Sequence, residues 1–215
     1  MTGTPAGRPR PGAVEAVVGV ELPAGLLVPA RSRHADFDEE GWCEVMIDLF
    51  DDLARLDLED EVAPPALDVD RTLSDLLDMA DSLDDSSRLV ASFGLPGRWP
   101  LPVIVSAEPA DDDVDLLDLA LARGGRPVEA PIVDDLPEAV GPGIVVTRFD
   151  LDDERDVWAT VACARRRDGL DVVALWRTND LGLVEPFRDR VVGLLGTVRA
   201  ETVTETETEI DGDDR

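Results

Sequence analysis

Residues 157–176 read VWATVACARRRDGLDVVALW, and this stretch decides the fold class. Residues 157–165 and 170–176 are rich in β-branched and other apolar side chains, which is typical of buried strands. The residues between them, Arg166-Arg167-Asp168-Gly169, end in Asp-Gly, a strong signal for a tight turn between antiparallel strands. The stretch therefore predicts a β-hairpin within a sheet.

Further strands and helices flank this hairpin. Strand patterns occupy residues 13–22, 26–28, 88–95, 101–108, 127–133 and 143–149. An Asp36-x-x-Glu39 capping box starts an amphipathic helix, whose apolar stripe is Trp42, Val45, Met46, Leu49, Phe50, Leu53 and Leu56. A second helix has the stripe Leu73, Leu76, Leu77, Ala80 and Leu83. We expect a short helix over residues 113–123 and a closing helix that begins near Asn179 or Asp180.

The order of these elements, β-β-α-α-β-β-α-β-β-β-β-α, predicts an α+β fold. Consecutive strands with short links favour antiparallel pairing, and amphipathic helices need a sheet face to cover. We expect a single, mainly antiparallel sheet of roughly six to eight strands covered by helices, an α/β/α sandwich. Residues 13–199 form this domain, preceded by a flexible arm (1–12) and followed by a disordered acidic tail (200–215).

The charge composition excludes some functions. The chain has 48 acidic and 20 basic residues, a net charge of −28; every basic residue is Arg, and there is one His. Nucleic acids and anionic membranes are bound through clustered cations, so the sequence predicts neither as a partner. The acidity fits a halophile surface or a high-GC genome, and the absence of Lys favours the second.

Targeting and redox signals are weak. The segment after Arg8 and Arg10 is a short apolar run interrupted by Glu15, which predicts no signal peptide and no membrane insertion. Cys43 and Cys163 lie far apart within apolar runs, so we expect buried, reduced thiols. These features favour a cytoplasmic protein.

The sequence gives little indication of a metal-binding site. His34 lies in a polar loop after Arg31 and Arg33 and is expected to be a surface residue. Asp150, Asp152 and Glu154 alternate as in a calcium loop, but Arg155 replaces the required Gly and Val161 the bidentate Glu. We interpret them as hairpin residues, and residues 111–113 as helix-start acids, and predict no metal site.

Catalytic motifs are also missing. The sequence has no Gly-x-Ser-x-Gly elbow, and a phosphate-binding Walker loop needs a Lys that the chain lacks. Gly141-Pro-Gly143 precedes a strand and is expected to be a turn. A carboxylate pair of the glycosidase type stays open, because so many acids are present. We predict no catalytic residues, no cofactor and a protein that is not an enzyme.

A surface for a protein partner is the remaining hypothesis. The Pro-rich loop before residue 102 presents Arg98, Trp99 and Leu101, which are candidate partner contacts; the alternative is that Trp99 folds over the sheet edge. Arg165-Arg166-Arg167 pairs with nearby acids or forms a basic cluster. Trp42, Trp158 and Trp176 are expected in the core.

The opening Val18-Gly-Val-Glu-Leu-Pro-Ala-Gly25, together with the order of elements, resembles the PsbP-like α/β/α sandwich. Over residues 13–199 the chain is similar to small actinobacterial proteins of that fold, including the LpqN group, often encoded near type VII secretion genes. The resemblance implies a non-enzymatic, protein-binding adaptor or chaperone-like factor that is associated with secretion. The large negative charge would steer such a factor toward a partner protein with a basic face. A carboxylate-based hydrolase, a small-ligand-binding protein and an acidic immunity or inhibitor protein are the alternatives.

Overall fold

A computed structural model describes residues 15–20, 25–57, 68–92, 100–123 and 126–203. The predicted hairpin is present: strands β7 (Val157–Arg167) and β8 (Leu170–Thr178) pair antiparallel and are joined by a two-residue turn. Both turn residues have left-handed backbone angles, with φ of 54° at Asp168 and 77° at Gly169. These angles match the twist of the flanking strands, which is why Asp-Gly occurs there.

This hairpin lies inside a seven-stranded sheet in the order β2-β3-β4-β8-β7-β6-β5, in which every neighbouring pair is antiparallel. The predicted α+β class and antiparallel sheet are therefore confirmed. The other strands of this sheet are β2 (Leu26–Val28), β3 (Ser87–Ser92), β4 (Leu101–Pro109), β5 (Ile132–Asp135) and β6 (Gly143–Leu151). The strand predicted over residues 127–133 begins later, at Ile132, although Pro127 forms a single bridge to Asp150.

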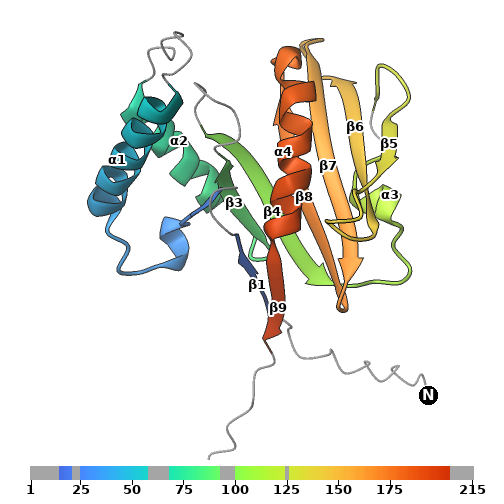
Figure 1. The fold of residues 1–215 in the computed structure, drawn as a ribbon, viewed down its shortest axis with the longest axis horizontal. Helices are drawn as coiled ribbons and strands as arrows, with labels where there is room; N and C mark the ends of the chain where they lie inside the picture. Colours follow the sequence, from blue (N-terminus) through green and yellow to red (C-terminus); the bar gives the residue numbers. More distant parts are fainter. Residues whose placement is uncertain (1–14, 21–24, 58–67, 93–99, 124–125, 204–215) are drawn as a thin grey trace, which may run out of the picture.

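Helix α4 (Val184–Thr197) covers one face of the sheet and follows the short 3-10 turn η2 (Leu181–Leu183). Figure 1 shows α4 lying along β7 and β8. Alternate residues of these strands point to it, and Trp176 of β8 contacts Phe187 of α4 edge to face, with ring centroids 4.6 Å apart. Both rings are fully buried, so this contact lies at the centre of the main hydrophobic core.

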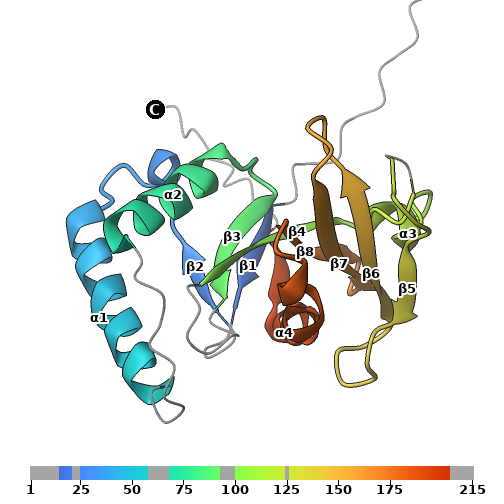
Figure 2. The same ribbon diagram turned by 90° about the horizontal axis from the view of Figure 1, so that it is seen from above.

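The opposite face carries the other helices, α1 (Glu39–Asp57), α2 (Val69–Ser82) and α3 (Leu116–Leu119). Helices α1 and α2 pack over β2 and β3, and α3 packs over β6 and β7. Seen from above in Figure 2, α1 and α2 lie at one end of the sheet and α3 lies at the other. Helix α4 lies across the strands from α2 and α3. The middle of this face has no helix among the described residues, and the sheet is open there.

The start of α1 differs from the predicted capping box. The carboxylate of Asp38, not Asp36, accepts a hydrogen bond from the Gly41 backbone N–H at 3.0 Å. Phe37 comes just before this cap and Trp42 four residues after it, and their ring centroids are 6.3 Å apart. Such an apolar pair across a helix start fixes how the chain enters the helix, so the Phe37–Trp42 contact selects Asp38 as the cap. Val45, predicted on the apolar stripe, is 65% exposed.

Helix α3 is also shorter than predicted, because Asp115 caps it and Leu121 already has a left-handed φ of 56°. Residues 13–22 were expected to join the main sheet, but β1 (Glu15–Gly19) pairs with β9 (Arg199–Val203) in a separate two-stranded sheet. Strand β9 corrects the expectation of a disordered tail from residue 200; the disorder prediction for residues 204–215 lies outside the described residues.

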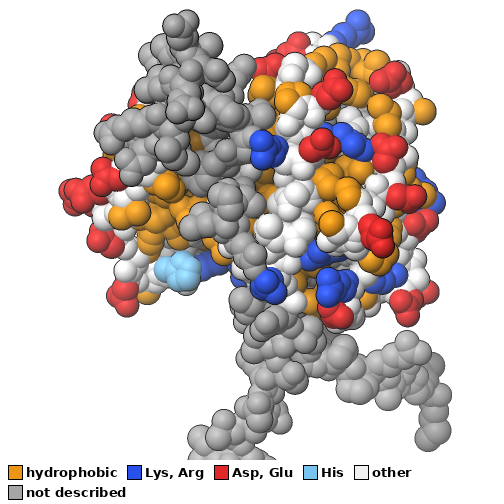
Figure 3. Space-filling model, viewed as in Figure 1, with side chains coloured by type: hydrophobic (Ala, Val, Ile, Leu, Met, Phe, Trp, Pro, Cys, Tyr) orange, Lys and Arg blue, Asp and Glu red, His pale blue; other side chains and the backbone are white. Residues whose placement is uncertain are grey.

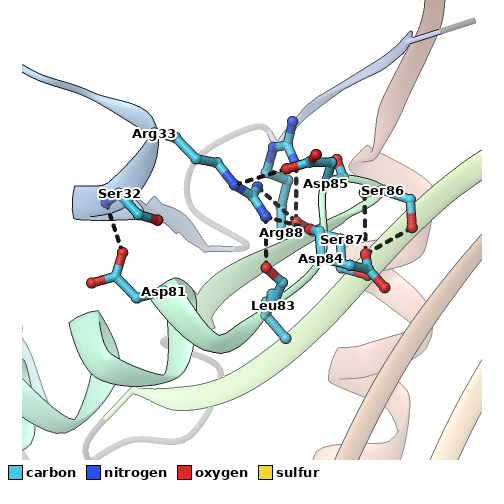
Figure 4. A network of polar contacts seen from close by, with 9 residues as sticks. All are labelled: Ser32, Arg33, Asp81, Leu83, Asp84, Asp85, Ser86, Ser87 and Arg88. Carbon is cyan, nitrogen blue, oxygen red and sulfur yellow. Dashed lines mark hydrogen bonds and ion pairs between the residues drawn. The ribbon is translucent and has the colours of Figure 1, made fainter. Parts of the chain in front are cut away.

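A polar network joins the segment before α1 to the end of α2, as Figure 4 shows. It begins in the 3-10 turn η1 (Arg31–Arg33). The guanidinium of Arg33 donates to the carbonyls of Leu83 and Ser87, at 2.9 and 3.1 Å, and to that of Asp84. These carbonyls belong to the C-cap residue of α2, to the turn after it and to the first residue of β3, so one guanidinium joins the end of α2 to the start of β3. The network is therefore structural, and it holds α2 on the sheet.

Candidate functional site

The open middle of the α1–α3 face contains a pocket of about 590 Å³, which we call the arginine pocket. Its lining residues come from β6, β7, β8 and the segment after α3: Leu121, Arg123, Arg126, Arg148, Asp150, Leu151, Asp153, Thr160, Leu175 and Arg177. Four arginines against two aspartates make its lining positive. The whole chain carries 48 acids and 20 arginines, so this balance is the reverse of the average.

Strand register places three of these residues in one row across the sheet. Arg148 of β6 pairs with Thr160 of β7, and Thr160 pairs with Arg177 of β8. Directly opposed residues of antiparallel strands have their side chains on the same face, a few ångströms apart. The side chains of Arg148, Thr160 and Arg177 therefore emerge together in the floor of the pocket.

Arg148 is the anchored member of this row, and only 7% of it is exposed. Its guanidinium donates two hydrogen bonds to the carboxylate of Asp150, at 2.7 and 2.6 Å. It also donates to the carbonyls of Leu121 and Arg123, at 2.8 and 3.2 Å. Because these carbonyls belong to the segment after α3, Arg148 holds that segment against the sheet and shapes one wall of the pocket.

The other three arginines differ in their partners. Arg123 forms ion pairs with Asp115 at 2.8 Å and Asp118 at 3.0 Å. Arg126 and Arg177 form no ion pair with any described residue. Arg177 instead lies over the ring of Trp158, 4.8 Å from its centroid, a cation–π contact that orients the guanidinium.

Trp158 is itself held in place. Its indole N–H donates to the Asp152 carboxylate at 2.9 Å. The same carboxylate accepts the backbone N–H groups of Glu154 and Asp156. These bonds, that of Asp156 first, lower the pKa of Asp152 below its usual value. The acidic run that resembled a calcium loop is therefore a turn that positions Trp158 beside the pocket.

An exposed apolar surface adjoins the pocket. Among the described residues, eight large hydrophobic side chains are exposed, and five of them follow the β5 end of the sheet. We call these five the apolar edge: Leu121, Val128, Ile132, Val133 and Leu151. Val128 is tied to β6 through its N–H, which donates to the Phe149 carbonyl at 2.8 Å. Leu121 and Leu151 also line the arginine pocket, so the two features are continuous.

Figure 3 shows the face that carries α4, which is opposite the arginine pocket. Acidic side chains lie around much of its border, and arginine and hydrophobic side chains lie between them. On this face, acids lie mainly toward the border, while apolar groups reach solvent in patches.

Of the three predicted partner contacts, the structure describes only Leu101. Arg98 and Trp99 lie outside the described residues. Leu101 begins β4, is half-buried and packs against the main core, so it is not a free surface anchor.

The Arg165-Arg166-Arg167 cluster does not form a basic patch. Arg165 is buried and donates to the carbonyls of Val140 and Val198, at 3.2 and 2.7 Å. Arg166 pairs with Asp171 at 2.6 Å, and Arg167 with Asp168 at 3.1 Å. The alternative that these arginines pair with nearby acids is confirmed for Arg166 and Arg167.

Of the predicted core residues, Trp176 and Cys163 are buried, whereas Trp42, Trp158 and Cys43 are half-buried. Both cysteines are free, and burial raises the pKa of the Cys163 thiol to about 12. His34 is exposed, as predicted. No three His, Cys, Asp or Glu side chains of the described residues are arranged to hold a metal ion. Within the same residues, no helix is long and apolar enough to cross a membrane.

Where a described carboxyl group has a shifted pKa, the shift is downward, at Asp81, Asp84, Asp115 and Asp152. Asp84, Asp115 and Asp152 accept hydrogen bonds at a turn or a helix start. Asp81, in the last turn of α2, accepts them from Arg31 and Ser32 of η1. A general acid at neutral pH needs the opposite shift.

The pocket residues Arg126, Arg148, Thr160 and Arg177 were missed by sequence reasoning. A signal for one pair was present, since Thr160 and Arg177 stand the same number of residues before and after the Asp168-Gly169 turn. Equal spacing from a two-residue turn places residues opposite each other. The remaining members come from distant segments, which the sequence alone does not bring together.

No family model and no curated protein matches the chain.

Proposed function

We propose that this protein is a non-enzymatic protein-binding adaptor or chaperone-like factor, and that its partner docks on the apolar edge. The observation that carries the proposal is the gathering of five exposed apolar side chains at one end of the sheet, with exposed fractions from 43% at Leu121 and Val133 to 55% at Val128. Single exposed apolar residues are ordinary, whereas five at one end of a sheet indicate an interaction site. Ile132 and Val133 are neighbours on β5 and face opposite sides of the sheet, so both sides of this edge carry exposed apolar groups.

The backbone at this edge supports the same role. Strand β5 is the last strand of the sheet, and among the described residues no further strand pairs with it. A terminal strand offers backbone N–H and C=O groups to a strand of another protein, and the side chains beside it supply specificity. Asp134 is held by Arg188 of α4 at 2.6 Å, which fixes β5 from the core side.

The resemblance to PsbP-like proteins supports an adaptor role. The partner class that it suggests is a component of a secretion system, such as a type VII system. The net charge of −28 would steer the protein toward a basic surface of such a partner. A cytoplasmic location belongs to the same proposal. The second candidate, a small-ligand-binding protein, is favoured by the arginine pocket and is developed below.

Site-specific photo-crosslinking tests the docking site. A benzophenone amino acid replaces Val128 in the apolar edge and, as a control, Leu181, which is 45% exposed in η2 near the start of α4. In lysate of the source organism, we expect one protein to be crosslinked from position 128 and not from position 181. An Ile132→Asp substitution should abolish that crosslink while circular dichroism stays unchanged. Equal crosslinking from both positions, or none from position 128, would contradict docking at the apolar edge.

A further inference from the structure

We propose that the arginine pocket binds the phosphate group of a small organic phosphomonoester. The pocket adjoins the apolar edge and shares Leu121 and Leu151 with it, but this proposal does not rest on a protein docking there. The proposal stands on three features of the pocket: its excess of arginines over aspartates, the row of polar side chains in its floor and its apolar walls.

In a chain with 48 acids and 20 arginines, an arginine has many carboxylates available, and Arg148 and Arg123 each have one or two. Arg126 and Arg177 line the same pocket, and neither forms an ion pair with a described residue. Asp150 and Asp153 also line the pocket, so the four arginines and two aspartates of the lining carry a net charge of +2. A phosphomonoester carries roughly −1.5 to −2 charges at pH 7, which matches this net charge.

The donor row supplies geometry. Arg177 is held over Trp158, and its planar guanidinium matches phosphate oxygens through paired N–H groups. Beside it, Thr160 is 7% exposed and lines the pocket. The four hydrogen bonds of Arg148 use all but one of its five N–H groups, so Arg148 contributes positive charge and shape more than free donors.

The walls favour an organic phosphate over the free ion. Leu121, Leu151 and Leu175 line the pocket together with the arginines. A volume of about 590 Å³ is much larger than a phosphate ion and lies in the range of small-molecule sites. The apolar side chains would contact the body of the ligand while the arginines hold its phosphate.

Isothermal titration calorimetry with the full chain tests this site. The probe is phenyl phosphate in low-salt buffer at pH 7.5, compared with inorganic phosphate and with succinate. We expect phenyl phosphate to bind at least tenfold more tightly than either. Arg126→Gln and Arg177→Gln should each weaken it at least tenfold, and Thr160→Val should weaken it severalfold.

The matched control is Arg190→Gln. Arg190 is exposed on α4, on the opposite face of the sheet, and its loss changes the net charge by the same amount. Affinity should be unchanged in this variant, and thermal unfolding of each variant verifies its fold. The proposal is overturned by no binding of phenyl phosphate at millimolar concentration, by equal weakening in the control, or by tighter binding of succinate. None of these results affects crosslinking from position 128, so the two proposals fail separately.

Discussion

Arg148 and Asp150, two residues apart on β6, are joined by two hydrogen bonds of 2.7 and 2.6 Å and are mostly buried, with 8% and 21% of their side chains exposed. Asp150→Ala should destabilise the protein by about 3 kcal/mol, because it leaves the Arg148 charge buried without its partner. The double variant Arg148→Met with Asp150→Leu should recover most of this loss. Urea unfolding of the three proteins measures the difference, and a single variant as stable as wild type would contradict the anchoring role of the pair.

Two glycines should respond to alanine in opposite directions. Gly169 has a φ of 77°, and its replacement should cost about 1–2 kcal/mol, since a residue with a Cβ is strained there. Gly193 lies in α4, and a Cβ added to it would meet only open space, so Gly193→Ala should stabilise by about 0.5–1 kcal/mol. Unfolding midpoints measure both effects. The same sign at both sites would contradict the turn geometry.

The hydroxyl of Thr147 is buried without a hydrogen-bond partner in the described structure. Replacing it with the isosteric valine should raise the free energy of unfolding by about 1 kcal/mol, because an unsatisfied polar group is removed from the core. Thr178→Val is the control: its hydroxyl accepts the Asp180 N–H at 3.0 Å, and its loss should cost about 0.5–1 kcal/mol. Destabilisation by Thr147→Val would show that the hydroxyl has a partner in solution.

Acid should weaken the turn that orients Trp158. Hydrogen bonds from Asp156, Trp158 and Glu154 lower the pKa of Asp152 below 3.8, so its carboxylate stabilises the folded state at pH above that value. This stabilisation is lost as the pH falls through the pKa of the folded state. The stability difference between wild type and Asp152→Asn should therefore be constant from pH 5 to 7 and shrink below about pH 4. Urea unfolding across this range measures it, and a difference independent of pH would refute the carboxylate's role.

Salt should stabilise the whole domain. With a net charge of −28, the acidic side chains of the folded protein repel one another. Raising NaCl from about 0.1 to 1 M shortens the screening length from about 10 to 3 Å and weakens this repulsion. We expect the unfolding temperature to rise with NaCl, and a fall would show that ion pairs such as Arg148–Asp150 outweigh the repulsion. Differential scanning calorimetry follows the change.

Local patterns in the sequence were enough to predict the hairpin, the antiparallel sheet and most helix positions. Asp168-Gly169 has a backbone preference of its own, and the leucines of α2 repeat at helical spacing, so each could be interpreted without knowing its neighbours. The start of α1 was misplaced because the choice between Asp36 and Asp38 depends on the contact of Phe37 with Trp42. That contact requires the folded chain.

The candidate site was less predictable for the same reason. Arg148 and Arg126 come from segments that α3 and its following loop bring together, and no motif marks them. The composition even pointed away from an anion site, because the net charge describes the whole chain and says nothing of the charge on one part of its surface. What matters at the pocket is which carboxylates are within reach of Arg126 and Arg177, and that depends on the register of β6, β7 and β8.

Strands β1 and β9 pair from Glu15↔Val203 at one end to Gly19↔Arg199 at the other. The chain therefore enters β1 and leaves β9 at the same end of this small sheet, which projects beyond the main sheet in Figure 1. Tension applied to the two chain ends would load one residue pair at a time, beginning at Glu15↔Val203, instead of shearing all pairs at once. Under force, this ladder would open like a zipper, before the seven-stranded sheet carries any load.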